Sequence, residues 1–590
     1  MNILFIAPSP MPYHEADNWL LKKSIKRIPQ IAINLGVIEL SSYLRDNVDS
    51  VSIKILDVAR DLAVVIDIYD GYAKKSYYEF LNDEINSVEF KPDIVGVSIM
   101  FSTSYKSALC LIDLAKQRWS GASIICGGNN ATNDYRKLLN NKNVDYVVRG
   151  EAEISFTKLV NNMMLGKNED IKGVIDRNKI VPQPSDNKSL TKTNVRKKNE
   201  IPILTKTNAR KKNEIPASSW RWQLSELIED LDEVPVPAYD LLDISFYTSK
   251  GSAYIMSSRG CVYNCSFCAT KTVHGMGMRY KSKKGFYKSI EYLVGLGFKR
   301  INIQDDMVGV HKDIFFDMID VLHEFKGKAK YLFPNGLNIK YNNEKTIDAF
   351  LSIGIETLIF SIESGSEYTM QNMVKKGAGV DLIKTKRLFR YIREKNKSAF
   401  ANFIIGFPYE TKDLMNETID YIMSLDMDWC YINSALPIPG TKMLTDFVEM
   451  GVIDEKYFDF DNLRHGKRTF DTPEILAEDL ENLVYDANIE RNFFNNCNYR
   501  DGLYEKAISV WNQIIINPYP FHIVGKYCRA MAKLKLGKID EYNDDLNDAI
   551  FWIESNEVSK WLFERYRKKM PELDLLWLSR ESPVEQTVTR

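Results

Sequence analysis

The sequence has little cysteine, no long apolar run and almost no net charge. Its 590 residues contain eight cysteines, which is too few for a scaffold of disulfides. No apolar stretch approaches the ~20 residues that cross a bilayer, so we expect no membrane span. The first apolar run, at residues 3–7, lacks the length and basic flank of a secretion signal, which favours a cytoplasmic location. Lysine and arginine number 78 and the acidic residues 79, so no overall field attracts nucleic acid, and we do not expect it as a partner.

The length and the order of apolar runs predict several domains. A chain of 590 residues exceeds what one hydrophobic core usually supports, and 45% hydrophobic with 27% charged residues is typical of globular proteins. In residues 1–165, short apolar runs alternate with helical stretches, which predicts an α/β domain with a Rossmann-like, doubly wound sheet. A second alternation in residues 251–454 predicts a partial or full (β/α) barrel. Residues 455–590 are rich in aromatic side chains and lack strand alternation, which predicts a helical C-terminal domain.

Residues 166–250 differ from the segments on either side. They begin with a predicted hairpin and contain a tandem duplication, because residues 190–202 recur with one substitution at residues 204–216. Two copies are too few for a solenoid, and the segment is polar, basic and bounded by proline. We therefore predict an exposed linker, with a phosphate-binding patch as the alternative interpretation of its charge.

Three of the eight cysteines stand together. Cys261, Cys265 and Cys268 form a C-x3-C-x2-C run directly after an apolar strand, in a loop that also carries glycine and asparagine. A structural zinc site needs four ligands, and only His274 lies near as a further candidate. A [4Fe–4S] cluster held by three cysteines leaves one iron open to a small molecule. The spacing therefore favours a reactive iron–sulfur cluster over structural zinc or three buried thiols.

This run resembles the signature of the radical SAM superfamily, C-x3-C-x-aromatic-C, with Phe267 as the aromatic residue. The resemblance implies that the three thiolates hold a [4Fe–4S] cluster whose open iron is chelated by S-adenosylmethionine (SAM). One-electron reduction by an external partner such as flavodoxin or ferredoxin would then cleave SAM to a 5′-deoxyadenosyl radical. The protein would orient the cofactors and exclude water and oxygen.

Four further segments resemble radical SAM motifs that follow barrel strands. Residues 301–306 resemble the second-strand motif that receives the methionine end of SAM, residues 360–366 the fourth-strand motif, residues 403–411 the fifth-strand motif, and residues 437–441 a segment common after the sixth strand. Ordinary explanations exist, since an Asp that ends a strand often belongs to a turn and a strand can simply run into a helix N-cap. The resemblance implies that SAM is contacted by Phe267, Asp305, Ser361, Glu363 and Ile404.

The N-terminal domain lacks a Gly-x-Gly-x-x-Gly motif and a Walker A motif, so nucleotide phosphates are poorly supported as its ligands. Its third and fourth strands instead end in segments that resemble those of cobalamin-binding domains. An Asp-x-His-x-x-Gly motif is absent, so histidine is not expected below the cobalt. A Rossmann-like domain without a ligand is the alternative. The resemblance implies that cobalamin is contacted by Ser98, Met100 (in place of leucine), Thr103, Gly127, Gly128, Gly150 and Glu151, the last two in an Arg-Gly-Glu-x-Glu segment.

Together these segments resemble the cobalamin-dependent radical SAM enzymes, with SAM, a [4Fe–4S] cluster and methylcobalamin as cofactors. The resemblance favours a methyltransferase that acts on an unactivated carbon or a phosphinate phosphorus of a small-molecule or peptide substrate, in secondary-metabolite biosynthesis. Ring contraction or oxidative cyclisation without methyl transfer is the alternative reaction, and a non-enzymatic iron–sulfur module is the alternative class. A methylthiotransferase is disfavoured, because the N-terminal half contains only Cys110 and Cys126 where a second cluster needs three cysteines. The sequence assigns no catalytic residue and no particular substrate.

Overall fold

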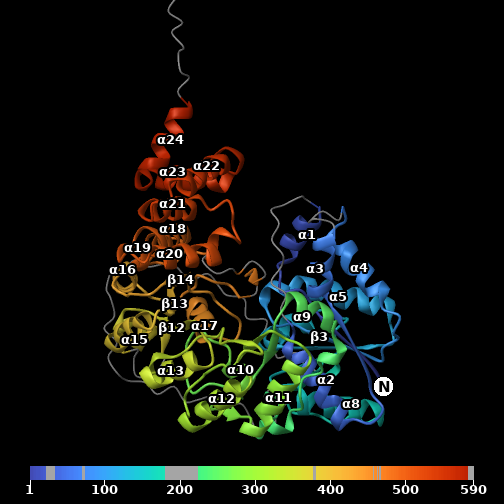
Figure 1. Ribbon diagram of the computed structural model, residues 1–590. Coiled ribbons are helices and arrows are strands. Elements are labelled where there is room, and N and C mark those ends of the chain that lie inside the picture. The colour runs from blue at the N-terminus through green and yellow to red at the C-terminus, as the bar shows by residue number, and fades with distance from the viewer. Residues whose placement is uncertain are drawn as a thin grey trace, which may run out of the picture.

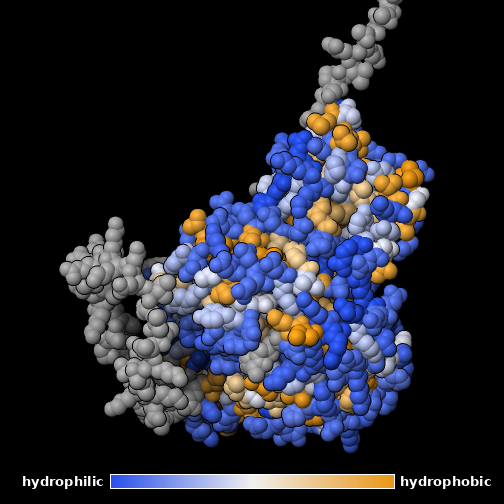
Figure 2. Space-filling view, turned by 90° about the vertical axis from the view of Figure 1, so that its left-hand side faces the viewer, coloured by the Kyte–Doolittle hydropathy of each residue, from blue (hydrophilic) through white to orange (hydrophobic). Residues whose placement is uncertain are grey.

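The computed structural model describes residues 1–21, 33–68, 74–179, 224–375, 381–455, 458–460, 463 and 467–581. The duplicated segment at residues 190–216 lies outside these ranges. The described chain forms an N-terminal α/β domain, a second α/β unit beside it and a stack of C-terminal helices (Figure 1). None of the described helices has the length and apolar character of a membrane span. The face shown in Figure 2 is largely hydrophilic, with hydrophobic residues in small groups.

The N-terminal domain is built on a six-stranded sheet in the order β2-β1-β3-β4-β5-β6. The first five strands are parallel, and β6 runs antiparallel to β5. The chain order reverses beside β1, which places a topological switch point at the carboxyl ends of β1 and β3, where doubly wound domains bind ligands. The predicted Rossmann-like fold is confirmed. Its strands are β1 Asn2–Ala7, β2 Ser52–Asp57, β3 Ile94–Ser98, β4 Ser123–Gly127, β5 Tyr146–Val148 and β6 Val174–Asp176.

Helices cover both faces of this sheet because its strands are apolar on both sides. In β1, Leu4 and Ile6 belong to one buried cluster and Ile3 and Phe5 to another, as expected when successive side chains point to opposite faces. The first face carries α1 Tyr13–Leu21, α3 Val58–Ile68, α4 Tyr77–Ser87 and α5 Tyr105–Arg118, and the second carries α2 Leu35–Asn47 and α8 Glu153–Met164. Two short helices, α6 Asn129–Asn133 and α7 Tyr135–Leu139, follow β4.

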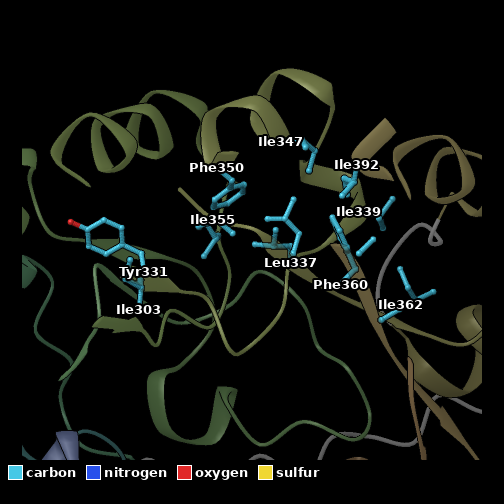
Figure 3. Close-up of a cluster of buried hydrophobic side chains, with 14 of the residues drawn as sticks. Ile303, Tyr331, Leu337, Ile339, Ile347, Phe350, Ile355, Phe360, Ile362 and Ile392 are labelled. Atoms are coloured by element: carbon cyan, nitrogen blue, oxygen red, sulfur yellow. The ribbon is translucent and has the colours of Figure 1, made fainter. Parts of the chain in front are cut away.

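The second unit is a partial barrel of six parallel strands. One three-stranded sheet has the order β11-β10-β7 and the other β12-β13-β14, and a bridge between Leu337 and Phe360 joins them. Phe350 and Ile392 from the surrounding helices belong to the same buried core as Phe360 of β12 (Figure 3). The strands are β7 Ala253–Ile255, β10 Arg300–Ile303, β11 Lys330–Leu332, β12 Thr357–Glu363, β13 Ser398–Ile405 and β14 Trp429–Ser434. The helices are α11 Lys283–Gly295, α12 Lys312–Glu324, α13 Glu344–Ser352, α15 Leu382–Glu394, α16 Lys412–Met423 and α17 Lys442–Glu449.

The C-terminal helices cover the free edge of this barrel at β14. Asn492 donates from Nδ2 to the Cys430 carbonyl (2.9 Å) and accepts from the Cys430 amide (2.9 Å). Asn488 makes the same pair of bonds with Ile432, at 2.8 and 3.1 Å. Two side-chain amides thus replace a neighbouring strand and satisfy backbone groups that a bare edge leaves unpaired. The helices are α18 Ala477–Ile489, α20 Tyr504–Trp511, α21 Ile523–Lys535, α22 Ile539–Ser555, α23 Glu557–Tyr566 and α24 Pro571–Glu581.

Residues 224–250 run between the two α/β units and contact both. The Ser42 hydroxyl of the N-terminal domain donates to the Val236 carbonyl (2.7 Å), and Lys281 of the barrel donates from Nζ to the Leu231 carbonyl (2.9 Å). The proline-containing segment therefore lies along both units, and it helps to hold them side by side.

Candidate functional site

The three cysteines lie on the loop between β8 Ser258–Arg259 and the helix that begins at Lys271. We call this segment, residues 260–270, the cysteine loop. Cys261, Cys265 and Cys268 are partly exposed and form no disulfide. Among the described residues, no three His, Cys, Asp or Glu side chains converge on a position for a single metal ion. Three separate thiols on one loop fit an iron–sulfur cluster, in which each thiolate binds a different iron, better than one zinc ion.

Neighbouring elements fix the backbone of this loop. The Ser266 amide donates to the Val374 carbonyl (2.9 Å), and the Met443 amide donates to the Ser266 carbonyl (2.8 Å). Gly260, which precedes the first cysteine, has φ +92°, and a Cβ there would lie 2.3 Å from the Gly277 carbonyl oxygen. Glycine alone fits this approach without strain, so the loop closes tightly on the residues that follow it.

Asp305 follows β10, as predicted, but its carboxylate points into the protein. It accepts hydrogen bonds from the Ser257 amide (2.6 Å) and the Ser258 hydroxyl (2.6 Å), and burial raises its pKa to about 6. These bonds hold the junction between β7 and β8. The predicted contact between Asp305 and the amino group of SAM is therefore left without geometric support.

Asp306, which the sequence motif does not single out, braces the cysteine loop. Its carboxylate accepts from the Gly260 amide (3.1 Å) and from the Thr270 hydroxyl (3.2 Å), and Thr270 Oγ1 lies 3.3 Å from Cys268 Sγ. One carboxylate thus ties both ends of the loop. The sequence shows two consecutive Asp residues after a strand, which indicates that a carboxylate stands there. It does not show which of the two faces the cysteine loop.

The backbone at the end of β12 is strained. Glu363 is buried and has φ +75°, and the pairing of β12 with β13 shifts register between Ser361 and Glu363. Positive φ is costly for a residue with a side chain, and such strain concentrates at functional sites. Ser361 also lies against Gly336, where a Cβ would stand 2.5 Å from Ser361 Oγ. The contact of Ser361 and Glu363 with SAM stays a prediction, which this strained strand end supports.

Phe267 of the cysteine loop meets the turn after β13. Its ring centroid lies 6.3 Å from that of Phe407, and Phe267 and Ile404 pack against the same apolar cluster. Glu410 holds this turn, because its buried carboxylate accepts from the amides of Gly406 (2.6 Å) and Phe407 (3.0 Å). Burial raises the pKa of Glu410 to about 7. Two residues predicted to contact SAM are thus brought together on one apolar surface.

The residues predicted to bind cobalamin divide into groups. Ser98 ends β3 and Gly127 ends the neighbouring β4, so both lie at the carboxyl edge of the sheet. Ser98 Oγ accepts from Asn34 Nδ2 (3.0 Å), and Met100 in the next loop is 37% exposed. A Cβ on Gly127 would meet no atom closer than 3.9 Å, so the space beside it is open. Open space and an exposed apolar side chain at this edge suit a large ligand.

Gly128, Thr103 and Gly150 have packing roles. Gly128 has φ +97°, and a Cβ there would lie 2.7 Å from the Ile99 carbonyl oxygen, so this glycine permits two loops to approach closely. The Thr103 hydroxyl donates to a carbonyl of the loop after β1 (2.8 Å), and the Gly150 amide donates to the Thr132 hydroxyl (3.0 Å). These contacts explain the three residues without a ligand.

The side chain of Glu151 contacts charged residues of the barrel. Its carboxylate lies 3.1 Å from Arg259 Nη1 and 2.7 Å from His274 Nδ1, and it accepts from Arg279 Nη1 (3.0 Å). Burial alone raises the pKa of this carboxyl, but hydrogen bonds from His274 and Arg279 outweigh it and lower the pKa to about 2. The predicted contact of Glu151 with cobalamin therefore competes with an ionic contact between the units. The motif gives no sign of it, because Glu151 and Arg259 are 108 residues apart.

The cysteine loop and the edge of the N-terminal sheet border the same region. The helix α10 Lys271–His274, which follows the cysteines, contacts α6, which begins directly after Gly128. Gly440, in the segment after β14, lies against α6 as well, since a Cβ there would stand 2.0 Å from Asn133 Oδ1. The carboxyl ends of strands from both units therefore meet across α6.

Two family models match the chain in this order. The model of the B12 binding domain matches residues 25–160, and the model of the radical SAM superfamily matches residues 255–422. The first range contains Ser98 and Gly127, and the second contains the three cysteines.

Known proteins with similar sequences or folds match most of the chain. An uncharacterized methyltransferase of Pyrococcus horikoshii is 28% identical over 396 residues, or 64% of this chain and 74% of that protein. The cytidylyl-2-hydroxyethylphosphonate methyltransferase of Streptomyces wedmorensis is 25% identical over 448 residues, or 72% of this chain and 80% of that protein. The structure of TsrM from Kitasatospora setae, with cobalamin and a [4Fe–4S] cluster bound, has a TM-score of 0.57 at 13% identity and covers 93% of this chain and 99% of its own. The structure of OxsB with aqua-cobalamin and SAM bound has a TM-score of 0.57 at 14% identity. The match covers 98% of this chain and 83% of OxsB. At these identities the structural likeness is one of fold.

Proposed function

The chain belongs to the radical SAM enzymes that carry a B12-binding domain, whose cofactors are cobalamin, a [4Fe–4S] cluster and SAM, and from that premise we propose that it is a methyltransferase. We assign residues 1–165 to cobalamin binding, residues 166–250 to a linker, residues 251–454 to the radical SAM core and residues 455–590 to a helical domain. The acceptor would be an unactivated carbon or a phosphinate phosphorus of a small-molecule or peptide substrate. A one-electron donor such as flavodoxin or ferredoxin would reduce the cluster.

One observation carries this proposal. The cysteine loop and the carboxyl edge of the B12-binding sheet border the same region, where α10 contacts α6. A reaction that draws on two cofactors needs both to face one substrate at short range. Two relatives further support methyl transfer, since the Pyrococcus and Streptomyces proteins are both named as methyltransferases.

The residues present fit the cofactors of the family. The three cysteines form no disulfide, lie on one braced loop and would hold the cluster. Phe267 and Ile404 form an apolar wall that would exclude water from SAM. The open space beside Gly127 and the exposed side chain of Met100 would admit the nucleotide tail of cobalamin. When bound, these groups supply a radical that removes a substrate hydrogen and a methyl group that takes its place.

Replacement of one cysteine tests the cluster assignment. We expect Cys265→Ala to abolish both the visible absorbance of the cluster and the formation of 5′-deoxyadenosine, because two thiolates do not hold the cluster stably. The protein would be reconstituted without oxygen with iron, sulfide and cobalamin, and its products would be measured by mass spectrometry. Cys110→Ala, a partly buried cysteine of α5, is the matched control and should behave as the wild type. Undiminished 5′-deoxyadenosine from Cys265→Ala would contradict the assignment.

The alternative reaction, ring contraction or oxidative cyclisation, uses the same cofactors. Methyl transfer consumes a second SAM and yields S-adenosylhomocysteine together with 5′-deoxyadenosine, whereas the alternative yields no S-adenosylhomocysteine. The ratio of the two products in the presence of substrate therefore separates the two reactions.

A further inference from the structure

A buried cluster of charges joins the two α/β units at the base of the cysteine loop. Arg259, two positions before Cys261, has a side chain that is only 4% exposed. Its Nη2 donates to Glu39 Oε2 (2.9 Å) and Glu153 Oε1 (2.7 Å), and its Nη1 donates to Glu151 Oε2 (3.1 Å). All three carboxylates belong to the B12-binding domain, on α2, after β5 and at the start of α8.

Glu151 also contacts two residues that follow the cysteine loop in the chain. Its carboxylate lies 2.7 Å from Nδ1 of His274, at the end of α10, and accepts from Nη1 of Arg279 (3.0 Å) in β9 Arg279–Tyr280. Arg259 precedes the cysteines in the chain, and His274 and Arg279 follow them. Carboxylates of the B12-binding domain therefore contact residues on both sides of the cysteine loop, which belongs to the barrel.

The charges in this cluster are matched. The three carboxylates face Arg259 and Arg279, and Lys281 lies buried nearby. Burial alone would lower the pKa of Arg259, but the three carboxylates raise it well above its ordinary value. Buried ion pairs are weak stabilisers, because desolvation of the charges offsets their attraction. They are specific in geometry, however, since a displaced partner leaves a charge buried alone.

The hydrophobic contact beside these buried charges constrains the relative position of the two units less strictly. Ile38 of α2 lies in the same buried cluster as Tyr239 and Ile255, so α2 also joins the two units through hydrophobic packing. Hydrophobic attraction is non-directional. The five charged side chains with fixed hydrogen-bond directions therefore define how the cysteine loop sits against the domain.

We propose that Glu39, Glu151, Glu153, Arg259 and Arg279 form a clamp that sets the position of the cysteine loop relative to the cobalamin edge of the neighbouring sheet. This inference rests on the proposed function, because it assigns cobalamin to one side of the clamp and the cluster to the other. Arg259 and Glu151 are positioning residues, because their side chains are buried and pair with each other. A misplacement of about 1 Å can cost roughly a hundredfold in rate, so the clamp controls whether the radical formed on one side meets the methyl group on the other.

Hydrogen exchange of the full-length protein without cofactors tests the clamp directly. In Glu151→Gln the side chain keeps its shape but loses the charge that pairs with Arg259 and Arg279. We expect amide exchange at residues 259–280 and at the start of α8 to become about tenfold faster, with other core segments unchanged. Arg45→Met is the matched control, because it removes an exposed ion pair between α2 and Asp240, and it should leave these segments unchanged. Unchanged exchange in Glu151→Gln would overturn the proposal.

The loaded protein offers a second readout. Pulsed electron paramagnetic resonance would measure the distance between cob(II)alamin and the reduced cluster, which we expect to broaden in Glu151→Gln and to stay narrow in Arg45→Met. With substrate, we expect 5′-deoxyadenosine to form at a near wild-type rate while the methylated product falls by about tenfold or more. A parallel fall of both products with an unchanged distance would overturn the clamp. Absence of methylation in the wild type would instead count against the proposed function, and the exchange measurement would still decide the clamp.

A milder variant covers the case in which Glu151→Gln does not fold. Glu39→Gln weakens one bond to Arg259 and leaves the contacts of Glu151 in place. We expect the same changes in exchange and distance to a smaller extent. Wild-type behaviour of Glu39→Gln together with a folded but unchanged Arg259→Lys would overturn the proposal, since lysine lacks the fork that reaches three carboxylates.

Discussion

Two adjacent glycines at the end of β4 have different roles: Gly127 leaves room for a ligand, and Gly128 permits two backbone segments to approach closely. Gly127 faces open space, whereas a Cβ on Gly128 would collide with the Ile99 carbonyl. We expect Gly127→Val to lose cobalamin on desalting while its melting temperature stays near that of the wild type. We expect Gly128→Val to lower stability by about 1–3 kcal/mol through strain at positive φ, whether or not cobalamin is present.

Absorbance of bound cobalamin after gel filtration, together with thermal unfolding of the protein without cofactor, distinguishes the two variants. Cobalamin retained in full by Gly127→Val would place the nucleotide tail elsewhere. A Gly128→Val protein as stable as the wild type would contradict the packing role of Gly128.

Glu410 makes the turn after β13 sensitive to pH. Its burial raises the pKa of the carboxyl from 4.5 to about 7, so the folded state binds this proton more tightly than the unfolded state. The contribution of Glu410 to stability is therefore greatest below pH 4.5 and decreases as pH rises through about 7. We expect Glu410→Gln to remove this decrease, since glutamine does not titrate.

The unfolding midpoint in urea, measured at pH 5.5 and pH 8, gives the pH dependence of each protein. The wild type should lose more stability than Glu410→Gln between the two values. Glu417→Gln, an exposed position on α16, should keep the wild-type slope. Parallel slopes for the wild type and Glu410→Gln would show that the carboxyl is already ionised at pH 5.5.

At the scale of elements, the edge of β14 depends on two asparagines. Asn492 pairs with both backbone groups of Cys430, and these groups are buried. We expect Asn492→Leu to lower the free energy of unfolding of this region by about 1–3 kcal/mol, because a buried amide and carbonyl lose their partner. Asn482→Ala on α18, where the side chain accepts from Arg565 away from the strand, is the control and should cost less. Equal losses in the two variants would contradict the edge-pairing role.

Most strands and helices are predictable from the sequence, because each depends on a local pattern. The apolar runs at residues 3–7, 94–100 and 123–126 predict buried parallel strands covered by helices, and the structure has β1, β3 and β4 there, with ends that differ by one or two residues. The six barrel strands follow the same pattern. A local pattern also places the cysteines after a strand and Glu363 at the end of another.

The roles of Asp305 and Glu151 are not predictable in this way, because they depend on contacts between distant parts of the chain. Asp305 bonds the residues that precede the cysteine loop, 48 positions earlier. The Glu39 contact with Arg259 spans 220 positions. A motif shows that a carboxylate stands at a strand end, but the partner that it meets is set by how the two units pack together.

At the scale of the whole molecule, the C-terminal helices complete the barrel. Phe400 of β13 and Trp429 of β14 are buried in one cluster with Phe493 and Trp511 of the C-terminal region. Removal of the helices would therefore expose both an apolar surface and the unpaired edge of β14, which is the combination that favours edge-to-edge association of strands.

We expect a chain that ends at Ile475 to be largely insoluble or to form oligomers, as measured by the soluble fraction and by light scattering after gel filtration. Substitution of single residues on the outer helical surface, such as Phe551→Ser, should leave solubility and cofactor binding intact, because Phe551 is 57% exposed. A monomeric, soluble chain ending at Ile475 that still binds the cluster would show that β14 tolerates an open edge. In that case the helices would be dispensable for the fold, and their role would have to lie in binding the substrate.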